Sequence, residues 1–369
     1  MQRIKTIFNR LDTPLFILVI TTSLLGILIV SSATSSFDNH IKFVIIQSGA
    51  FLFGLFALFV ISFLGGENIA NFSKWLAGIS IVLLVAVLLV GIGGSETGTT
   101  GWFDFGLFSI QPSELVKVAF IITLAKHIEY IGDDINYIKN IGFLLLHAAI
   151  PIGLILLQPD YGTAMVFLFI FIAMLFAAGI NWRYLGAGFG IFAFLSPIMY
   201  FFILNDIQRN RILSFINPEV SLSSGAYQVS QSKLAIGSGQ IFGRQLFSGP
   251  LTQLGLLPEK QTDMIYAVAG EELGFIGCIV ILLLLTAIIL RCIYLSTHAK
   301  SRLVFIMTIG VAAYLFCHMS ENILMCLGLM PVTGIPLPFI SYGGSSMLTS
   351  MLAISLVITS FPSKKGISF

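Results

Sequence analysis

The stretch LPEKQTDMIYAVAGEELGFIGCIVILLLLTAIILRCIY, residues 257–294, turns from polar to apolar at Asp263. Its apolar part is long enough for a membrane-spanning helix, which needs about 20 such residues. Asp263 then lies at the boundary between water and hydrocarbon, where partial desolvation can tune a carboxylate for acid or base chemistry. The alternative is a structural role, in which Asp263 only caps the helix.

The composition predicts a membrane protein. Of the 369 residues, 57% are hydrophobic and 10% are charged, whereas soluble domains carry about 25% charged residues. Because apolar runs recur, we expect an all-α polytopic membrane protein with a single transmembrane domain over residues 1–369. The net charge of +2 gives no indication of a nucleic-acid partner. The four cysteines fall inside apolar runs, which indicates small buried residues rather than disulfides or metal ligands.

About ten transmembrane helices are expected. They lie near residues 13–34, 40–64, 71–94, 112–130, 141–157, 163–180, 183–204, 264–294, 301–328 and 338–362. Lysine and arginine concentrate in the segments that are cytoplasmic if the N-terminus is inside, and Lys42 alone falls in a short outer loop. The positive-inside rule therefore predicts that both termini are cytoplasmic.

A large extracytoplasmic loop over residues 205–262 is expected between the seventh and eighth helices. A connection of that length is usually functional or disordered. Its apolar content disfavours disorder, and we expect an interfacial helix near residues 227–236. Arg209 and Arg211 stand at its start. Arginine suits bidentate phosphate binding, and contact with lipid headgroups is the alternative.

Two further sites place charged residues at the outer ends of predicted helices. Glu114 and Lys117 lie on one helical face of the fourth span, either as an ion pair that fixes packing or as a site for an anionic ligand. Asp160 directly precedes a helix, where capping is the simpler interpretation and ligand binding is the alternative.

The segment from Gly334 to Ser346 contains two prolines and paired glycines that prevent regular helix. Irregular backbone at this depth must be packed in protein or line a wet cavity. Ser345 and Ser346 are therefore candidate donors to a phosphate or a sugar, and simple re-entrant packing is the alternative.

These segments together resemble the SEDS family (shape, elongation, division and sporulation), whose members include RodA, FtsW and SpoVE. The resemblance covers nearly the whole chain. It rests on five motifs in the family's order, Gln111 to Glu114, Gln158 to Thr163, Gln208 to Arg211, Pro258 to Gly274 and Pro331 to Ser346. Gln261 and Met264 differ from the histidine and phenylalanine that family members often carry, which leaves the elongation, division or sporulation branch open.

The resemblance implies a peptidoglycan glycosyltransferase that polymerises lipid II on the outer face of the bacterial cytoplasmic (inner) membrane. The family's essential aspartate maps onto Asp263, and its acidic and basic pair maps onto Glu114 and Lys117. A class B penicillin-binding protein, which supplies the transpeptidase, is implied as the partner, with lipid II and membrane lipid as the other contacts.

Our mechanistic hypothesis is a single inverting displacement. Asp263 acts as general base on the acceptor hydroxyl, while Lys117, Arg209 and Arg211 bind phosphate. The sequence assigns no cofactor with certainty, and a divalent cation, Mg²⁺ or Mn²⁺, held by the carboxylates is one candidate. Two alternatives stay open. One is a lipid II flippase, since broken helices and membrane-depth charges also occur in transporters, and the other is a non-catalytic membrane scaffold for a penicillin-binding protein.

Overall fold

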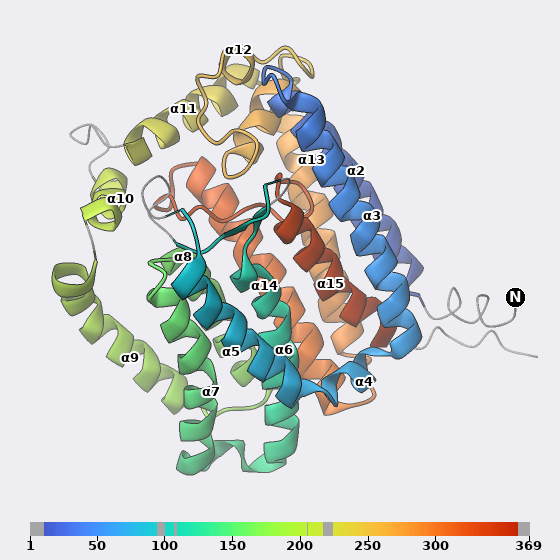
Figure 1. Cartoon of the computed structure of the whole chain (residues 1–369), viewed down its shortest axis with the longest axis vertical. Helices are drawn as coiled ribbons and strands as arrows, with labels where there is room; N and C mark the ends of the chain where they lie inside the picture. Colours follow the sequence, from blue (N-terminus) through green and yellow to red (C-terminus); the bar gives the residue numbers. More distant parts are fainter. Residues whose placement is uncertain (1–10, 94–99, 107–108, 205, 217–223, 361–369) are drawn as a thin grey trace, which may run out of the picture.

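The computed structural model describes residues 11–93, 100–106, 109–204, 206–216 and 224–360 (Figure 1). Each of the ten predicted spans coincides with a helix. These helices are α2 Thr13–Thr34, α3 His40–Leu64, α5 Ser73–Val90, α6 Pro112–Ile131, α7 Ile138–Leu156, α8 Tyr161–Ala177, α9 Trp182–Ile198, α13 Ile265–Ser296, α14 Arg302–Cys326 and α15 Gly344–Ser360.

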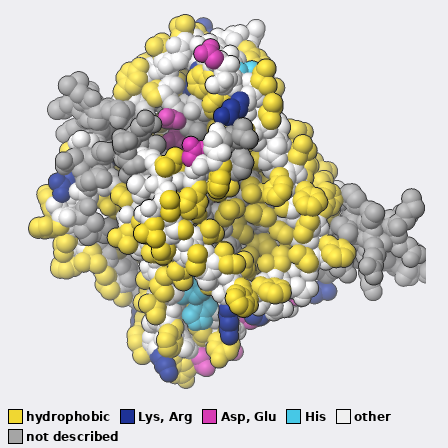
Figure 2. Space-filling model, in the orientation of Figure 1, with side chains coloured by type: hydrophobic (Ala, Val, Ile, Leu, Met, Phe, Trp, Pro, Cys, Tyr) yellow, Lys and Arg dark blue, Asp and Glu magenta, His cyan; other side chains and the backbone are white. Residues whose placement is uncertain are grey.

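Length and composition qualify seven of the described helices as able to cross a membrane. α8 and α15 are apolar but shorter, and α6 carries two acidic and two basic residues besides its histidine. Figure 2 shows apolar side chains over the middle of the visible face, with charged side chains mainly toward its two ends. The all-α polytopic fold is confirmed. The number of spans and the cytoplasmic termini stay predictions, and the extreme termini lie outside the described residues.

Short elements join the long helices. On one side of the bundle lie α4 Gly66–Ala70 and the 3₁₀ turn η1 Gly132–Asn136, and on the other lies a two-stranded antiparallel ribbon of β1 Phe103–Asp104 and β2 Ser109–Ile110. A π-helical turn, η2 Met199–Ile203, follows α9. Residues 205–262, which we predict to be extracytoplasmic and call the outer loop, form α10 Asp206–Ile216, α11 Ser224–Gly239 and α12 Pro250–Gln253 in their described part.

The large outer loop is folded over the end of the bundle. Figure 1 shows α11 and α12 at the top, next to the start of α13, while α9 and α10 stand apart at the left edge. The helix predicted near residues 227–236 lies within α11, and its position at the membrane interface stays a prediction. The helix α10 was not predicted, because its 11 residues alternate polar and apolar types without a clear apolar run.

One predicted boundary is wrong for a local reason. The last span was expected from residue 338, but α15 begins at Gly344, because Pro336 and Pro338 donate no backbone hydrogen bond and Phe339 has a φ of +64°. The seventh span was expected over residues 183–204. α9 ends at Ile198, directly after Pro197, and a π-helical turn continues it to Ile203, so the expected extent of this span is confirmed.

Two buried carboxylates tie the outer loop to α13. Glu271 accepts hydrogen bonds from the backbone N–H groups of Leu251 (2.7 Å) and Thr252 (2.9 Å) at the start of α12. Glu272 accepts from the Gln253 amide at 3.0 Å and from the Ser32 hydroxyl at the end of α2. Because both carboxylates find donors, the loop and the helix ends are fixed as one unit around the start of α13.

The same helix changes direction at Gly274. This residue has a φ of +69° and a ψ of −166° inside α13. A Cβ atom placed there would lie 2.3 Å from the backbone nitrogen of Gly243 in the outer loop. Only glycine therefore allows both the bend and the close approach of the loop.

We predict that Gly274→Ala lowers the free energy of unfolding by about 3 kcal/mol or more, since it combines positive-φ strain with a backbone clash. Thermal melting of the purified protein in detergent measures the change. Gly78→Ala is the matched control, because a Cβ at Gly78 meets nothing within 4 Å and alanine favours a helix. An unchanged melting temperature for Gly274→Ala would contradict the proposed packing.

Candidate active site

Asp263 lies in a tight turn directly before α13. The turn is closed by backbone hydrogen bonds from the N–H groups of Thr262 and Met264 to the Glu259 carbonyl, each 3.1 Å long. Glu259 adopts a φ of +48° to make this closure possible. The Asp263 side chain is partly buried, whereas the following residues from Met264 to Glu272 are buried in the protein. The carboxylate thus sits at the edge of the packed core, as the sequence predicts.

Asp263 does not act as a helix cap through its side chain. The residue at the N-cap position of α13 is Met264, and no side-chain cap hydrogen bond is formed there. Among the described residues, none donates a hydrogen bond to the Asp263 carboxylate. The alternative of a structural cap is therefore wrong, and both carboxylate oxygens are free to accept a proton from a bound molecule.

The surroundings of Asp263 shift its pKa into the neutral range. Burial raises the pKa of this carboxyl, the negative charge of Glu259 raises it further, and Arg211 lowers it, with a result of about 7. A carboxylic acid with a pKa near neutrality is well matched to general base catalysis at physiological pH.

The two predicted phosphate-binding arginines lie in different environments on α10. Arg209 donates through Nε to the Tyr200 carbonyl (3.0 Å) and through Nη2 to the Phe201 carbonyl (2.7 Å). Its guanidinium therefore binds two carbonyls within the preceding π-helical turn. Arg211 is half-buried and forms no hydrogen bond or ion pair with the described residues. Its charge lowers the pKa of Asp263, so Arg211 is a cation whose donors bind no acceptor among the described residues.

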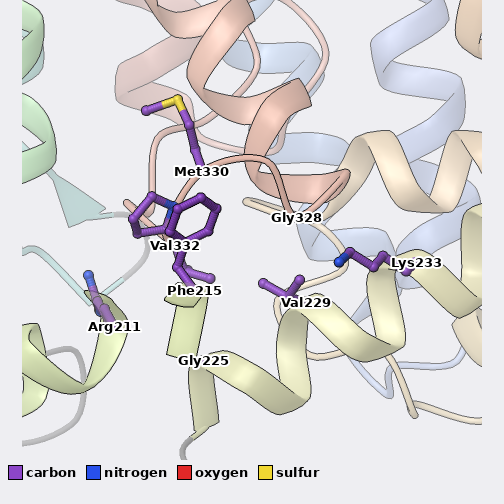
Figure 3. Close-up of a pocket in the computed structure, with 9 residues that line it drawn as sticks. Arg211, Phe215, Gly225, Val229, Lys233, Gly328, Met330 and Val332 are labelled. Carbon is purple, nitrogen blue, oxygen red and sulfur yellow. The ribbon is translucent and has the colours of Figure 1, made fainter. Parts of the chain in front are cut away.

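A small pocket beside Arg211 lies between α10 and α11 on one side and the segment after α14 on the other. Figure 3 shows Arg211 at one end and Lys233 at the other, with Phe215 and Val229 between them. The pocket encloses about 20 Å³, which is room for about one water molecule. A sugar diphosphate does not fit inside it, so a substrate of that size would bind along its opening or displace α10 and α11.

Lys117, on α6, is completely buried, with 0% of its surface exposed. Its ammonium donates to Glu114 Oε1 at 2.7 Å and to Nε2 of His318 at 2.8 Å. Nδ1 of His318 lies 3.1 Å from the Pro336 carbonyl, so Nδ1 carries the proton and Nε2 accepts. The predicted ion pair is confirmed. Since Lys117 is already bound on two sides, direct contact with an anionic ligand would require these bonds to exchange.

The remaining predicted residues connect outer segments. Asp160 caps α8 by accepting from the Thr163 N–H at 3.0 Å, and its other oxygen accepts from the Gln111 amide at 3.0 Å. The Ser345 hydroxyl accepts from the Gln111 N–H at 3.2 Å, and Ser346 is buried in the first turn of α15. The capping interpretation of Asp160 is confirmed. Among the described residues, none of these three side chains forms a hydrogen bond with the Asp263 turn.

Sequence reasoning missed the polar residues of α14. His318 and Asn322 lie one helical turn apart within a predicted membrane span, and both are completely buried. Polar residues at that depth are costly and are often functional, which was the available signal. His318 holds Lys117, and Asn322 donates to the backbone carbonyl of Asp263 at 2.9 Å.

Comparisons with known proteins agree with this architecture. The chain is 32% identical over 368 residues to peptidoglycan glycosyltransferase MrdB of Escherichia coli K12, covering 99% of this chain and 97% of that protein. It is 34% identical over 355 residues to the probable peptidoglycan glycosyltransferase FtsW of Trichlorobacter lovleyi, covering 94% and 92%.

Solved structures share the fold as well. A chain from a peptidoglycan synthase complex, studied for the coordination of polymerization and crosslinking, matches with a TM-score of 0.82 at 30% identity, over 95% of this chain and 97% of that chain. The rod shape determining protein RodA of Thermus thermophilus matches with a TM-score of 0.70 at 28% identity, over 95% and 96%. The family model described as cell cycle protein, for FtsW, RodA and SpoVE, matches residues 11–364. The chain therefore belongs to the FtsW/RodA/SpoVE family.

Proposed function

We propose that this protein is a peptidoglycan glycosyltransferase, which polymerises lipid II into glycan strands on the outer face of the bacterial cytoplasmic membrane. Family membership and the two named glycosyltransferase relatives support this activity. The observation that carries the mechanism is the state of Asp263. Its carboxylate is partly buried, accepts no hydrogen bond from the described residues, and has a pKa raised to about 7.

The reaction is a one-step inverting displacement. Asp263 removes the proton of the 4-hydroxyl group on the acceptor sugar, and that oxygen attacks the anomeric carbon of the donor. The bond between this carbon and the diphosphate oxygen breaks, and the diphosphate leaves with the electron pair. The α linkage of the donor becomes a β linkage. No second carboxylate is needed as an acid, because the diphosphate is already a good leaving group.

Arg211 stabilises the departing diphosphate in this proposal. Its guanidinium binds no acceptor among the described residues, and its charge lowers the pKa of Asp263, so we place the negatively charged leaving group beside this arginine. Arg209 and Lys117 are less suited to direct phosphate contact, since their donors already bind protein acceptors. The ion pair of Glu114 and Lys117 then stabilises the site indirectly, because Lys117 links α6 to His318 on α14.

We keep a divalent cation as a proposal, although the described side chains do not form a metal site for it. The described residues contain no group of three His, Cys, Asp or Glu side chains arranged to hold a metal ion. Magnesium bound to a phosphate substrate often uses only one or two carboxylates. Since the residues do not form a resident site, each step above relies on Asp263 and Arg211 alone.

A class B penicillin-binding protein is the proposed partner. The support is the likeness to a chain of a peptidoglycan synthase complex in which polymerization and crosslinking are coordinated. Such a partner would supply the crosslinking activity, for which we assign no residue in this chain.

We predict that Asp263→Asn reduces glycan synthesis by about 10²–10⁴-fold, the range expected for loss of a general base. The assay uses purified protein with its partner in vesicles that contain lipid II. Asp104→Asn is the matched control, since Asp104 is an exposed aspartate whose carboxylate accepts, among the described residues, only the nearby Gly106 N–H. Near-normal polymer formation by Asp263→Asn would exclude the base, and transfer of labelled lipid II across the bilayer without any glycan would favour a flippase.

We also predict that kcat/KM decreases as the pH is lowered below about 7, the pKa of Asp263, because the base must be deprotonated to act. Glu259→Gln removes a like charge and moves this acid limb to lower pH. Arg211→Gln removes an opposite charge and moves it to higher pH. Arg244→Gln, which removes an outer arginine that binds the Ser238 carbonyl, leaves the limb in place. Shifts in the same direction for Glu259→Gln and Arg211→Gln would contradict the assignment.

A further inference from the structure

Three successive backbone carbonyls of the Asp263 turn are held from the same side. The Gln261 carbonyl accepts from the Tyr342 N–H at 2.8 Å. The Thr262 carbonyl accepts from the Ser341 hydroxyl at 2.7 Å. The Asp263 carbonyl accepts from the Asn322 side-chain amide at 2.9 Å. Two of these donors are side chains, so their identity, and not only the fold of the backbone, determines whether the bonds form.

Both side chains also hold the segment from Pro331 to Gly343, which connects α14 to α15. The Asn322 amide donates a second hydrogen bond to the Ile335 carbonyl at 2.8 Å. The Ser341 hydroxyl accepts from the Leu337 N–H at 2.8 Å, which leaves its own proton for Thr262. Asn322 and Ser341 are almost fully buried, with 0% and 2% of their surfaces exposed. Water therefore cannot replace these donors at low cost.

The connecting segment also forms a wall beside the Asp263 carboxylate. A Cβ atom on Gly334 would lie 3.5 Å from Asp263 Oδ2, which is van der Waals contact. Gly334 has a φ of +77° and directly precedes Ile335, whose carbonyl is bound by Asn322. Hence the Asn322 amide binds both the backbone of Asp263, together with the Cys326 thiol at 3.5 Å, and the segment that lies beside the Asp263 carboxylate.

We propose that Asn322 and Ser341 are positioning residues for the transferase reaction, because together they set the direction of the Asp263 carboxylate toward the acceptor hydroxyl. This inference rests on the proposed role of Asp263 as the base. The turn is held through its carbonyls and not through its carboxylate, so Asp263 is oriented without losing the lone pairs that accept the proton. A displacement of about 1 Å at a reacting group can reduce the rate by about 10²-fold.

The test compares Ser341→Ala and Asn322→Leu with wild type in the lipid II assay, with the partner present. Each variant is expected to lower kcat by about 10- to 100-fold, while KM for lipid II stays within about twofold, since the lost bonds do not touch the substrate. The acid limb of the pH profile should move as well, because the distances from Asp263 to Arg211 and Glu259 change. Ser341→Thr keeps the hydroxyl and should restore most of the activity.

Ser355→Ala is the matched control. It removes a buried serine hydroxyl that binds the Met351 carbonyl within α15, far along the helix from the Asp263 turn, and should leave kcat and the pH profile unchanged. If Asn322→Leu does not fold, Ser341→Ala and Ser341→Thr decide the question between them.

The possible results separate this inference from the function itself. Wild-type protein that makes no glycan with its partner contradicts the transferase function. If wild type is active and Asp263→Asn is inactive, the transferase function and the base are supported. An unchanged kcat in Ser341→Ala would then overturn the positioning role alone. The positioning role is equally overturned if kcat and the melting temperature fall together while KM rises, or if Ser341→Thr melts like wild type without regaining activity.

Discussion

Irregular backbone at the edge of a membrane persists only if its N–H and C=O groups find partners within the protein. Two such stretches meet in this molecule, the turn from Glu259 to Met264 and the connection from Pro331 to Gly343. The backbone carbonyls of the turn find their donors in the connection and in Asn322. The result is a non-helical platform at the end of three helices, and the Asp263 carboxylate on it receives no hydrogen bond from the part of the chain that the structure describes.

The same constraint explains the buried charges nearby. A lysine with no exposed surface is costly unless its ammonium is paired and hydrogen bonded. Lys117 is bound by Glu114 and by the unprotonated nitrogen of His318, and His318 in turn is oriented by the Pro336 carbonyl. Pro336 belongs to the connection that also holds the Asp263 turn. The ion pair of α6 and the candidate base are therefore linked through one segment, although they do not share a hydrogen bond.

Local signals were enough to predict much of this arrangement. Apolar runs predicted the long helices, the Asp160 cap followed from its place before α8, and the spacing of Glu114 and Lys117 predicted their ion pair. Asp263 stood out because it is the last charged residue before the apolar run that starts at Met264. The difference between Arg209 and Arg211 was not visible in the sequence, since it depends on carbonyls of the preceding π-helical turn. Asn322 and Ser341 were missed because their partners lie 59 and 79 residues away, and one sequence does not show such pairings.

The central claim is that Asp263 takes the proton of the acceptor sugar. A structure of the Asp263→Asn protein with its partner and bound lipid II tests it most directly. The account predicts the acceptor 4-hydroxyl within about 2.6–3.2 Å of the side chain at position 263, with the donor diphosphate against Arg211. An acceptor hydroxyl bound instead to another carboxylate, such as that of Glu259, and out of reach of position 263, would contradict it.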